Sequence, residues 1–189
     1  MTKRLILMAG AAFVVMLAAA AFVAPIPFAS AGQGCDAGAW APWAVPRLGV
    51  YRTEAFSHGG NCANAVVMLV VRAPNGAPLW SDSMPAAQLM TFAGVNTPRE
   101  MPRALGEWLR QSHLFKSSAD LPPWKKGESA PTTGEFVFYP DEGMDRDSYE
   151  KTRSARVPVF CYVQGMESLA CIVLEDGAMI KIGLQTFPG

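Results

Sequence analysis

Residues 157–185 read VPVFCYVQGMESLACIVLEDGAMIKIGLQ and contain the clearest structural pattern in the chain. Three runs rich in β-branched and apolar residues are separated by Gly165-Met166-Glu167 and by Asp176-Gly177, which are typical tight-turn sequences. This pattern predicts three antiparallel strands, at 157–164, 168–175 and 178–185. We therefore expect the last third of the chain to form a β-meander.

The lengths of the two turns also predict how the strands pair, because antiparallel partners have residue numbers with a constant sum. A three-residue turn at 165–167 places Cys161 opposite Cys171, and a two-residue turn at 176–177 places Cys171 opposite Ile182. Both hairpins bring the same apolar residues to one face, which we expect to face the core. These residues are Val159, Cys161, Val163, Leu169, Cys171, Val173, Ile180, Ile182 and Leu184.

The four cysteines, Cys35, Cys62, Cys161 and Cys171, are most simply explained by two disulfides formed in an oxidising compartment. Side chains directly opposite in an antiparallel pair have Cβ atoms about 4.5–5.5 Å apart, close enough to be bridged after a small adjustment. The predicted register therefore pairs Cys161 with Cys171. By elimination, Cys35 pairs with Cys62.

Further strands are predicted upstream. Residues 49–57 and 64–72 form β-like runs on either side of a segment dense in turn formers, which predicts a hairpin. Pro74-Asn75-Gly76 then predicts a turn into another short strand, and 135–139 is a further candidate. In contrast, residues 32–46 show neither a strand nor a helix period, and we expect an irregular lead-in there.

One amphipathic helix is expected, ending near Gln111. Thr97 and Glu100 have the spacing of a capping box, although Pro102 belongs in a first helical turn and allows a start near Met101. A helical turn is expected at 147–154 with Ser148 as its N-cap, and a long surface loop at 117–133. The predicted fold class is mainly β: an antiparallel meander or a small β-barrel or β-sandwich of about six to eight strands, with one packed amphipathic helix.

The first 31 residues have the layout of a secretory signal peptide. Lys3 and Arg4 precede an apolar run at 5–23, and Ala29-Ser30-Ala31 has the small residues that signal peptidase requires. We expect cleavage before Gly32, which leaves residues 32–189 as a single domain in the periplasm or outside the cell. The apolar run is also nearly long enough to span a bilayer, so an uncleaved inner-membrane anchor is the alternative.

Charge argues against a nucleic-acid partner. Of the 16 Lys and Arg residues, Lys3 and Arg4 fall in the leader, so 14 remain against 16 Asp and Glu residues, a formal net charge of −2 for residues 32–189. Phosphate-backbone binding depends on a concentrated positive surface, and no stripe of Lys and Arg is visible in the sequence. A membrane partner is expected only if the N-terminal segment is retained.

Few residues suggest catalysis. His58 and His113 are the two histidines, and the cysteine closest to His58 is expected to be in a disulfide, which excludes a thiolate nucleophile. A zinc site at Cys35, His58 and Cys62 lacks paired ligand spacing, and the acidic segment 141–147 lacks the alternation of a calcium loop. Ser148 and Lys151 match a Ser-x-x-Lys pattern, but its companion motifs are missing. We expect no cofactor and no metal site.

The remaining candidates for recognition are aromatic residues in irregular segments. Trp40, Trp43 and Trp124 lie in Pro-rich segments, and His58 lies in a Gly-rich turn, so we assign these four residues to a candidate binding surface. The sequence thus favours an exported, non-enzymatic binding or inhibitory module that acts on an unknown protein or envelope-component partner. A small periplasmic hydrolase with an unrecognised site and a membrane-anchored structural envelope component are the alternatives.

Overall fold

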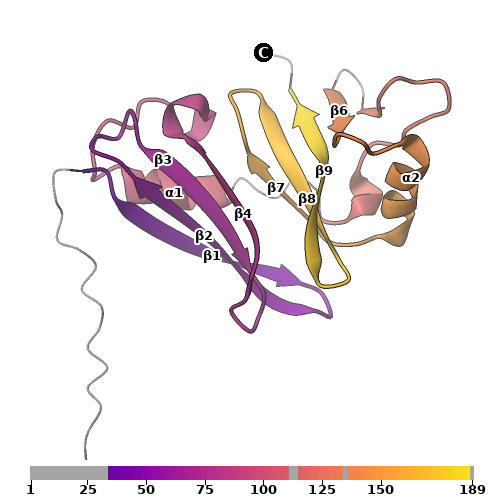
Figure 1. Cartoon of the computed structure of the whole chain (residues 1–189), viewed down its shortest axis with the longest axis horizontal. Helices are drawn as coiled ribbons and strands as arrows, with labels where there is room; N and C mark the ends of the chain where they lie inside the picture. The colour runs from indigo at the N-terminus through magenta and orange to yellow at the C-terminus, as the bar shows by residue number, and fades with distance from the viewer. Residues whose placement is uncertain (1–33, 111–114, 134–135, 188–189) are drawn as a thin grey trace, which may run out of the picture. The chain divides into compact units, whose positions relative to one another are not determined.

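The computed structural model describes residues 34–110, 115–133 and 136–187. Within these ranges the chain forms nine β-strands and two α-helices, and the strands make two open antiparallel sheets (Figure 1). The predicted mainly-β class and both predicted disulfides are confirmed. Two details differ from the prediction: the described sheets do not close into a barrel, and a second α-helix accompanies the first.

The first sheet is a four-stranded meander in which each strand pairs with its neighbour in sequence. Its predicted central hairpin is present, and the Asn75-Gly76 turn leads into the last strand as expected. The strands, in their order across the sheet, are β1 (Ala37–Val45), β2 (Gly49–His58), β3 (Val66–Arg72) and β4 (Pro78–Pro85).

Strand β1 replaces the irregular lead-in that the sequence predicted. Its residues alternate between half-buried and exposed, and it pairs with β2 over its whole length. Small alanines on the half-buried side weaken the period-2 signal, because alternation of Ala with Gly or Pro carries little contrast in hydrophobicity. Pro42 is tolerated because β1 lies at the edge of the sheet, where one side of the strand has no hydrogen-bonded neighbour.

The second sheet contains the C-terminal meander and two short strands. The first hairpin has the predicted register, with Cys161 opposite Cys171 and their Cα atoms 4.0 Å apart. Across the sheet the order is β5 (Thr132–Thr133), β6 (Phe136–Pro140), β9 (Ala178–Thr186), β8 (Ser168–Glu175) and β7 (Val159–Val163).

The second hairpin departs from the predicted register at one point. Val173 lies opposite Ile180 as predicted, but a bulge between Cys171 and Ile172 places Gly183, not Ile182, opposite Cys171. Gly183 has a φ of 153°, and a Cβ atom there would collide with the carbonyl oxygen of Tyr139 on β6. Close approach of the neighbouring strand at a glycine therefore shifts the pairing by one residue.

Helix α1 (Met101–Arg110) packs on β1 and β2 and also contacts β7. It begins at Met101, so Pro102 lies in the first turn, where its missing N–H is tolerated. The Glu100 carboxylate accepts the backbone N–H groups of Asn96 and Thr97, both at 3.1 Å. These hydrogen bonds stabilise the ionised form and lower the pKa of Glu100.

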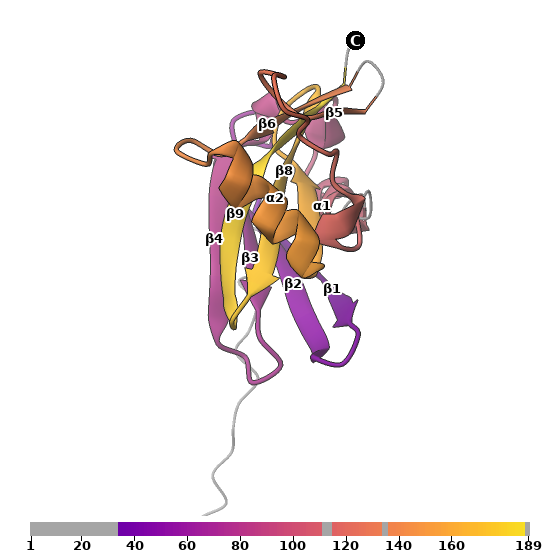
Figure 2. The same cartoon turned by 90° about the vertical axis from the view of Figure 1, so that its right-hand side faces the viewer.

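Helix α2 (Arg146–Ala155) lies in front of the second sheet in the view of Figure 2. The predicted N-cap, Ser148, is wrong: Asp145 is the N-cap, and its carboxylate accepts the backbone N–H of Ser148 at 2.8 Å. That bond lowers the pKa of Asp145. The predicted loop at 117–133 also contains a short 3-10 helix, Ser118–Asp120, that packs beside α2.

Coverage of the second sheet on both faces changes which residues are buried. Every residue of β7 is buried, including those on the side that simple alternation assigns to solvent. On one side of the sheet, Tyr149 of α2 packs against Phe138, with ring centroids 5.7 Å apart. On another side, Trp108 of α1 packs against Tyr162. The predicted single core face is therefore wrong in part, and Ile180 is 45% exposed near the end of its hairpin.

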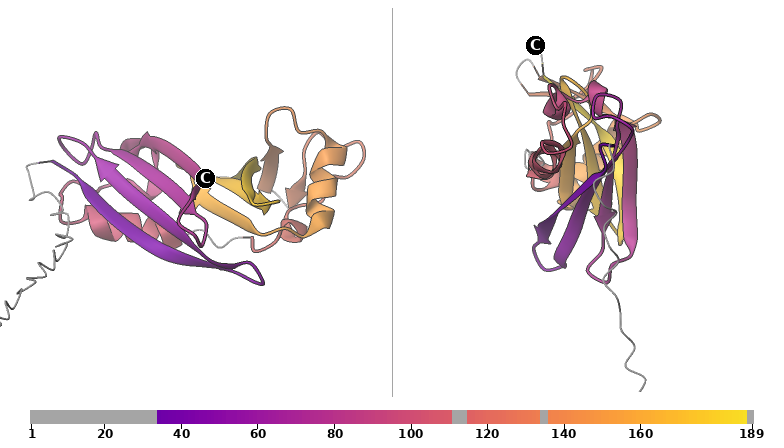
Figure 3. Two further views of the ribbon diagram at one scale, coloured as in Figure 1. Left: turned by 60° about the horizontal axis from the view of Figure 1, so that its bottom comes forward. Right: turned by 90° about the vertical axis from the view of Figure 1, so that its left-hand side faces the viewer.

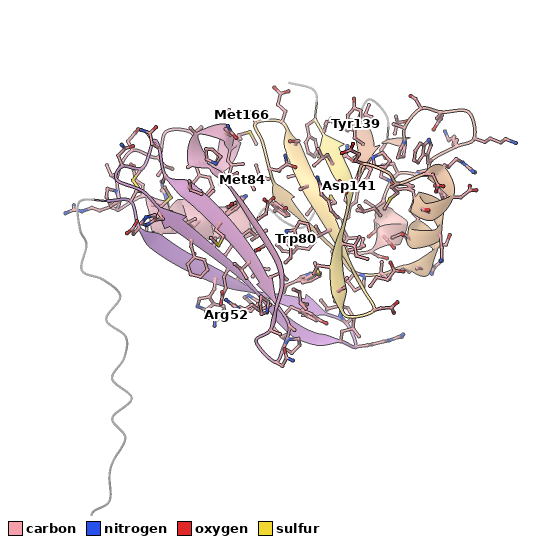
Figure 4. All side chains as sticks on the ribbon, viewed as in Figure 1. Arg52, Trp80, Met84, Tyr139, Asp141 and Met166 are labelled. Atoms are coloured by element: carbon pink, nitrogen blue, oxygen red, sulfur yellow. A yellow bond between two sulfur atoms is a disulfide. The ribbon has the colours of Figure 1, made fainter. Side chains whose placement is uncertain are left out.

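Contacts between the sheets come from aromatic side chains. Trp43 of β1 lies 5.4 Å from Phe160 of β7 between ring centroids, and Trp108 of α1 donates its indole N–H to the carbonyl oxygen of Val163 at 2.8 Å. The Trp80 side chain lies between the ribbons of the two sheets (Figure 4) and donates to the hydroxyl of Tyr162 at 3.3 Å. One core is therefore shared by both sheets.

Two disulfides fit an oxidising compartment. Among the residues that the structure describes, no helix has the length and apolar character that crossing a membrane requires. The predicted leader, residues 1–31, and His113 lie outside the described residues.

Candidate binding site

A pocket with a volume of about 840 Å³ lies where three separate segments of the described chain meet, and it is larger than the pocket of about 400 Å³ beside Met166. One segment is the end of β1 with its turn into β2, the second precedes the 3-10 helix at 118–120, and the third runs from the end of α2 into β7. In Figure 3, left, the tip of the β1–β2 hairpin extends toward this part of the second sheet. The lining residues are Pro42, Trp43, Ala44, Val45, Pro46, Arg47, Leu48, Phe115, Lys116, Ser117, Arg156, Pro158 and Val159.

Trp43 forms part of the pocket wall at the junction of the sheets. Its ring contacts Tyr51 of β2 at 5.5 Å and Phe160 of β7 at 5.4 Å, measured between centroids. Contacts with both sheets restrict its rotamers, so the indole presents a fixed apolar surface. The pocket wall at this position is therefore preorganised.

Arg47 enters the pocket from a tight turn. The backbone N–H of Leu48 donates to the carbonyl oxygen of Val45 at 3.1 Å, which closes a four-residue turn. Pro46 occupies the second position and Arg47 the third with φ +68°, a combination typical of a type II turn. Glycine is preferred at that third position because it has no Cβ atom to clash, and asparagine tolerates the positive φ better than most other residues. Arginine is thus held in a strained conformation.

Arg156, at the end of α2, is a second arginine with a left-handed backbone. It is the C-cap residue, with φ +55° and ψ +35°, and its backbone N–H donates to the carbonyl oxygen of Arg153 at 3.3 Å. Glycine is the usual residue at a left-handed helix terminus. A cation near a helix C-terminus interacts favourably with the helix dipole, which offsets part of the strain.

Lys116 is supported by a short antiparallel bridge. Its carbonyl oxygen accepts the backbone N–H of Val159 at 3.3 Å, and Ser117 pairs with Pro158. The Asp120 carboxylate accepts the backbone N–H groups of Lys116 and Ser117, at 3.1 Å and 3.0 Å. Both hydrogen bonds join the Asp120 carboxylate to backbone N–H groups at the capping box. No ion pair joins this carboxylate to the Lys116 ammonium group.

The sequence-predicted surface residues do not all contribute to this pocket. Trp43 lines it, whereas Trp40 lies on the opposite face of β1, 62% exposed, with the Arg52 guanidinium 5.0 Å from its ring centroid. Trp124 contacts Tyr149 at 5.9 Å and donates its indole N–H to the Glu128 carbonyl oxygen at 2.8 Å.

His58 is exposed and lies beside a disulfide. Its Nδ1 is 3.0 Å from the Asp36 carboxylate, which also accepts the backbone N–H of Gly59 at 3.1 Å. The neighbouring Cys62 is bonded to Cys35, so no thiolate is available to His58. In the described ranges, no group of three or more His, Cys, Asp or Glu residues has the arrangement of a metal site.

Sequence reasoning missed Arg47, Lys116 and Arg156. Arg47 lies within a turn, Lys116 precedes a 3-10 helix and Arg156 ends a helix. The three are far apart in the chain, so no local motif connects them. The only local signal was a non-glycine residue after Pro46, where a type II turn favours glycine. Their proximity depends on how the two sheets pack.

Comparisons with protein families, with curated proteins and with solved structures found no match. The geometry of the pocket is therefore the basis for the function proposed below.

Proposed function

We propose that this chain is an exported, non-enzymatic binding module and that the pocket at the junction of the sheets holds a component of the cell envelope. The observation that carries the proposal is the pocket itself. Its volume of about 840 Å³ lies in the range of about 300–1,000 Å³ that is typical of small-molecule sites. It combines apolar walls with a few convergent polar groups, as such sites do.

The residues of the pocket support binding over catalysis. Among those that line it, Ser117 is the one hydroxyl, and there is no His, Asp, Glu or Cys side chain. The Ser117 hydroxyl oxygen accepts the backbone N–H of Ala119 at 3.3 Å, so it serves as a cap. Acyl transfer commonly uses a general base hydrogen-bonded to the nucleophile. The lining has no carboxylate or imidazole for that role, and no hydrogen bond joins the Lys116 ammonium group to the Ser117 hydroxyl among the described side chains.

Export is supported by chemistry that is independent of the pocket. Both disulfides require oxidising conditions, and the first 31 residues have the charge and apolar pattern of a secretory leader. A bacterial periplasm meets both requirements and contains envelope components that a pocket of this size accommodates. The two disulfides also make a rigid scaffold, which lowers the entropic cost of binding.

The test is selective capture of an envelope component. The full chain, with its own leader and a C-terminal affinity tag, is expressed in an exporting bacterium and recovered from the envelope. Bound small molecules and lipids are then identified by mass spectrometry. The Ala44→Trp variant places a large side chain at the pocket wall, and the matched Ala178→Trp variant places one on the exposed start of β9.

We expect one component to be enriched with the original chain and with Ala178→Trp, and to be lost with Ala44→Trp. Equal recovery with Ala44→Trp would show that the pocket is not the binding site. Turnover of the captured component by the purified protein would instead favour the hydrolase alternative.

A further inference from the structure

Three cations surround the apolar pocket, and none is neutralised by the protein. Arg47, Lys116 and Arg156 are all exposed, and no ion pair in the described part of the chain involves any of them. Seven of the 14 Lys and Arg residues in the described ranges are in ion pairs, for example Arg72 with Glu54 at 2.8 Å and Arg153 with Glu150 at 2.7 Å. Three of the seven described cations that have no ion pair therefore line one pocket, in a domain with a slight excess of acidic residues.

The backbone conformation adds a second, independent observation. The described residues with positive φ that are not glycine are Arg47, Arg156 and Asp176. Aspartate is tolerated in the left-handed region and is a favoured turn residue, whereas arginine has no such preference. Both strained arginines line the same pocket. Strain of this kind persists at binding sites because function, not folding, selects the side chain.

The favourable interaction of Arg156 with the helix dipole does not explain why Arg47 and Arg156 are both arginines. Arg47 lies in a turn between two strands, where no helix terminus is present, yet it has the same left-handed backbone. A requirement for positive charge at the pocket accounts for both arginines and for Lys116 together.

The apolar side chains of the pocket indicate that the ligand has an apolar part in addition to its negative charge. Trp43, Leu48 and Phe115 line the same pocket as the cations. A purely ionic ligand gains nothing from these side chains, whereas an organic anion with an apolar body contacts both features. The pocket volume limits the ligand to a single molecule of modest size.

We infer that the ligand is a small amphiphilic organic anion. Its carboxylate, sulfonate or phosphate head lies among Arg47, Lys116 and Arg156, and its aromatic or aliphatic body lies against Trp43. This inference rests on the binding function proposed above and specifies the chemistry of its ligand. It assigns a free molecule that enters the pocket, in contrast to a membrane surface, which contacts exposed cations without filling a pocket.

Two dyes with the same ring system test the role of charge. Anilinonaphthalene sulfonate has a sulfonate group, and N-phenyl-1-naphthylamine is its neutral counterpart. Fluorescence titrations use the chain as recovered from the envelope, and Ala44→Trp defines the signal that does not arise in the pocket. The charge variant is Arg47→Gln with Arg156→Gln, and its matched control is Arg103→Gln with Arg110→Gln on α1.

We expect the charge variant to weaken sulfonate binding about tenfold, which corresponds to two charge-assisted contacts of modest strength at exposed sites. Binding of the neutral dye should stay within about twofold, because apolar contact does not depend on charge. The control variant should bind both dyes like the original chain. Added salt should weaken only the sulfonate, because screening acts on charge.

The alternatives give distinguishable results. If both dyes bind in the pocket but neither responds to the arginine changes, the anionic ligand is excluded and the binding module stands. If neither dye binds, or if Ala44→Trp binds both unchanged, the pocket is not a ligand site and both proposals fail. Association with anionic phospholipid vesicles that is insensitive to Ala44→Trp would establish a membrane surface as the occupant and overturn the assignment to a free molecule.

Discussion

The hydroxyl of Tyr162 on β7 donates a hydrogen bond of 2.7 Å to the carboxylate of Asp82 on β4, and so joins an edge strand of one sheet to an edge strand of the other. The same hydroxyl accepts the indole N–H of Trp80 at 3.3 Å. Residues about eighty positions apart in sequence therefore form one polar link between the sheets.

Removing this link should destabilise the fold. Tyr162→Phe deletes the donor to Asp82 and leaves the Trp80 indole without its acceptor, which costs about 1–2 kcal/mol in free energy of unfolding. Urea unfolding at neutral pH measures the loss. Tyr139→Phe is the control, because Tyr139 is 51% exposed, and a change within about 0.5 kcal/mol is expected there. Equal effects of the two substitutions would contradict the role of the link.

The stability of the fold should fall at alkaline pH because of the same residue. Burial is the main cause that raises the pKa of Tyr162 above its usual range, and the hydrogen bond to Asp82 adds to it. The pKa of tyrosine in the unfolded chain is about 10. Below that pH the protonated Tyr162 contributes its full stabilisation, and as pH rises further this contribution is lost, because the unfolded chain releases the proton more easily than the folded protein. Between pH 9 and pH 11 the original chain should lose more unfolding free energy than Tyr162→Phe. Parallel pH profiles would refute this assignment.

Arg47→Gly should stabilise the fold while weakening ligand binding. A left-handed backbone costs a non-glycine residue about 1–2 kcal/mol, and the extra flexibility of glycine in the unfolded chain offsets part of that, so a gain of about 0.5–1 kcal/mol is expected. Arg47→Ala is the matched control, since it removes the guanidinium and retains the strain. If both variants have the stability of the original chain, strain at Arg47 is not significant.

Gly183→Ala should be strongly destabilising. An added Cβ atom meets the carbonyl oxygen of Tyr139 and the backbone of Pro140, where β9 and β6 pair, and the φ of 153° is also unfavourable. We expect a loss of about 2–4 kcal/mol because backbone atoms cannot move aside cheaply. Gly177→Ala, which has open space around its Cβ position, should lose less. Thermal or urea unfolding compares the two.

The two disulfides should differ in their contribution to stability. The Cys35–Cys62 bond has a sequence separation of 27 and Cys161–Cys171 a separation of 10, and all four sulfurs are in buried residues. Loop-closure entropy then predicts losses of about 3.5 and about 2.7 kcal/mol when each pair is changed to alanine. A larger loss for Cys161–Cys171, measured by urea unfolding, would show that packing in the sheet outweighs chain entropy.

Sequence alone determined the local structure wherever turn chemistry and strand composition agree. Asp176-Gly177 and 165–167 are short turns between β-rich runs, and the length of the turn at 165–167 specified the Cys161–Cys171 pairing before any tertiary information. The same arithmetic held as far as Lys181 and failed beyond it, because the bulge between Lys181 and Gly183 depends on the approach of β6, a strand about forty residues upstream. Strand β1 was missed because alternating Ala, Gly and Pro residues carry little hydrophobic contrast.

Only the tertiary structure decided what surrounds each residue. Trp43 was a candidate by composition, but its place between Tyr51 and Phe160 follows from the packing of two sheets. Arg47, Lys116 and Arg156 carry no shared sequence signal, and they line one pocket because a hairpin turn, a bridge and a helix terminus meet there. Turns and registers arise from interactions between residues near in sequence, whereas a pocket built from distant segments exists only once the core has brought them together.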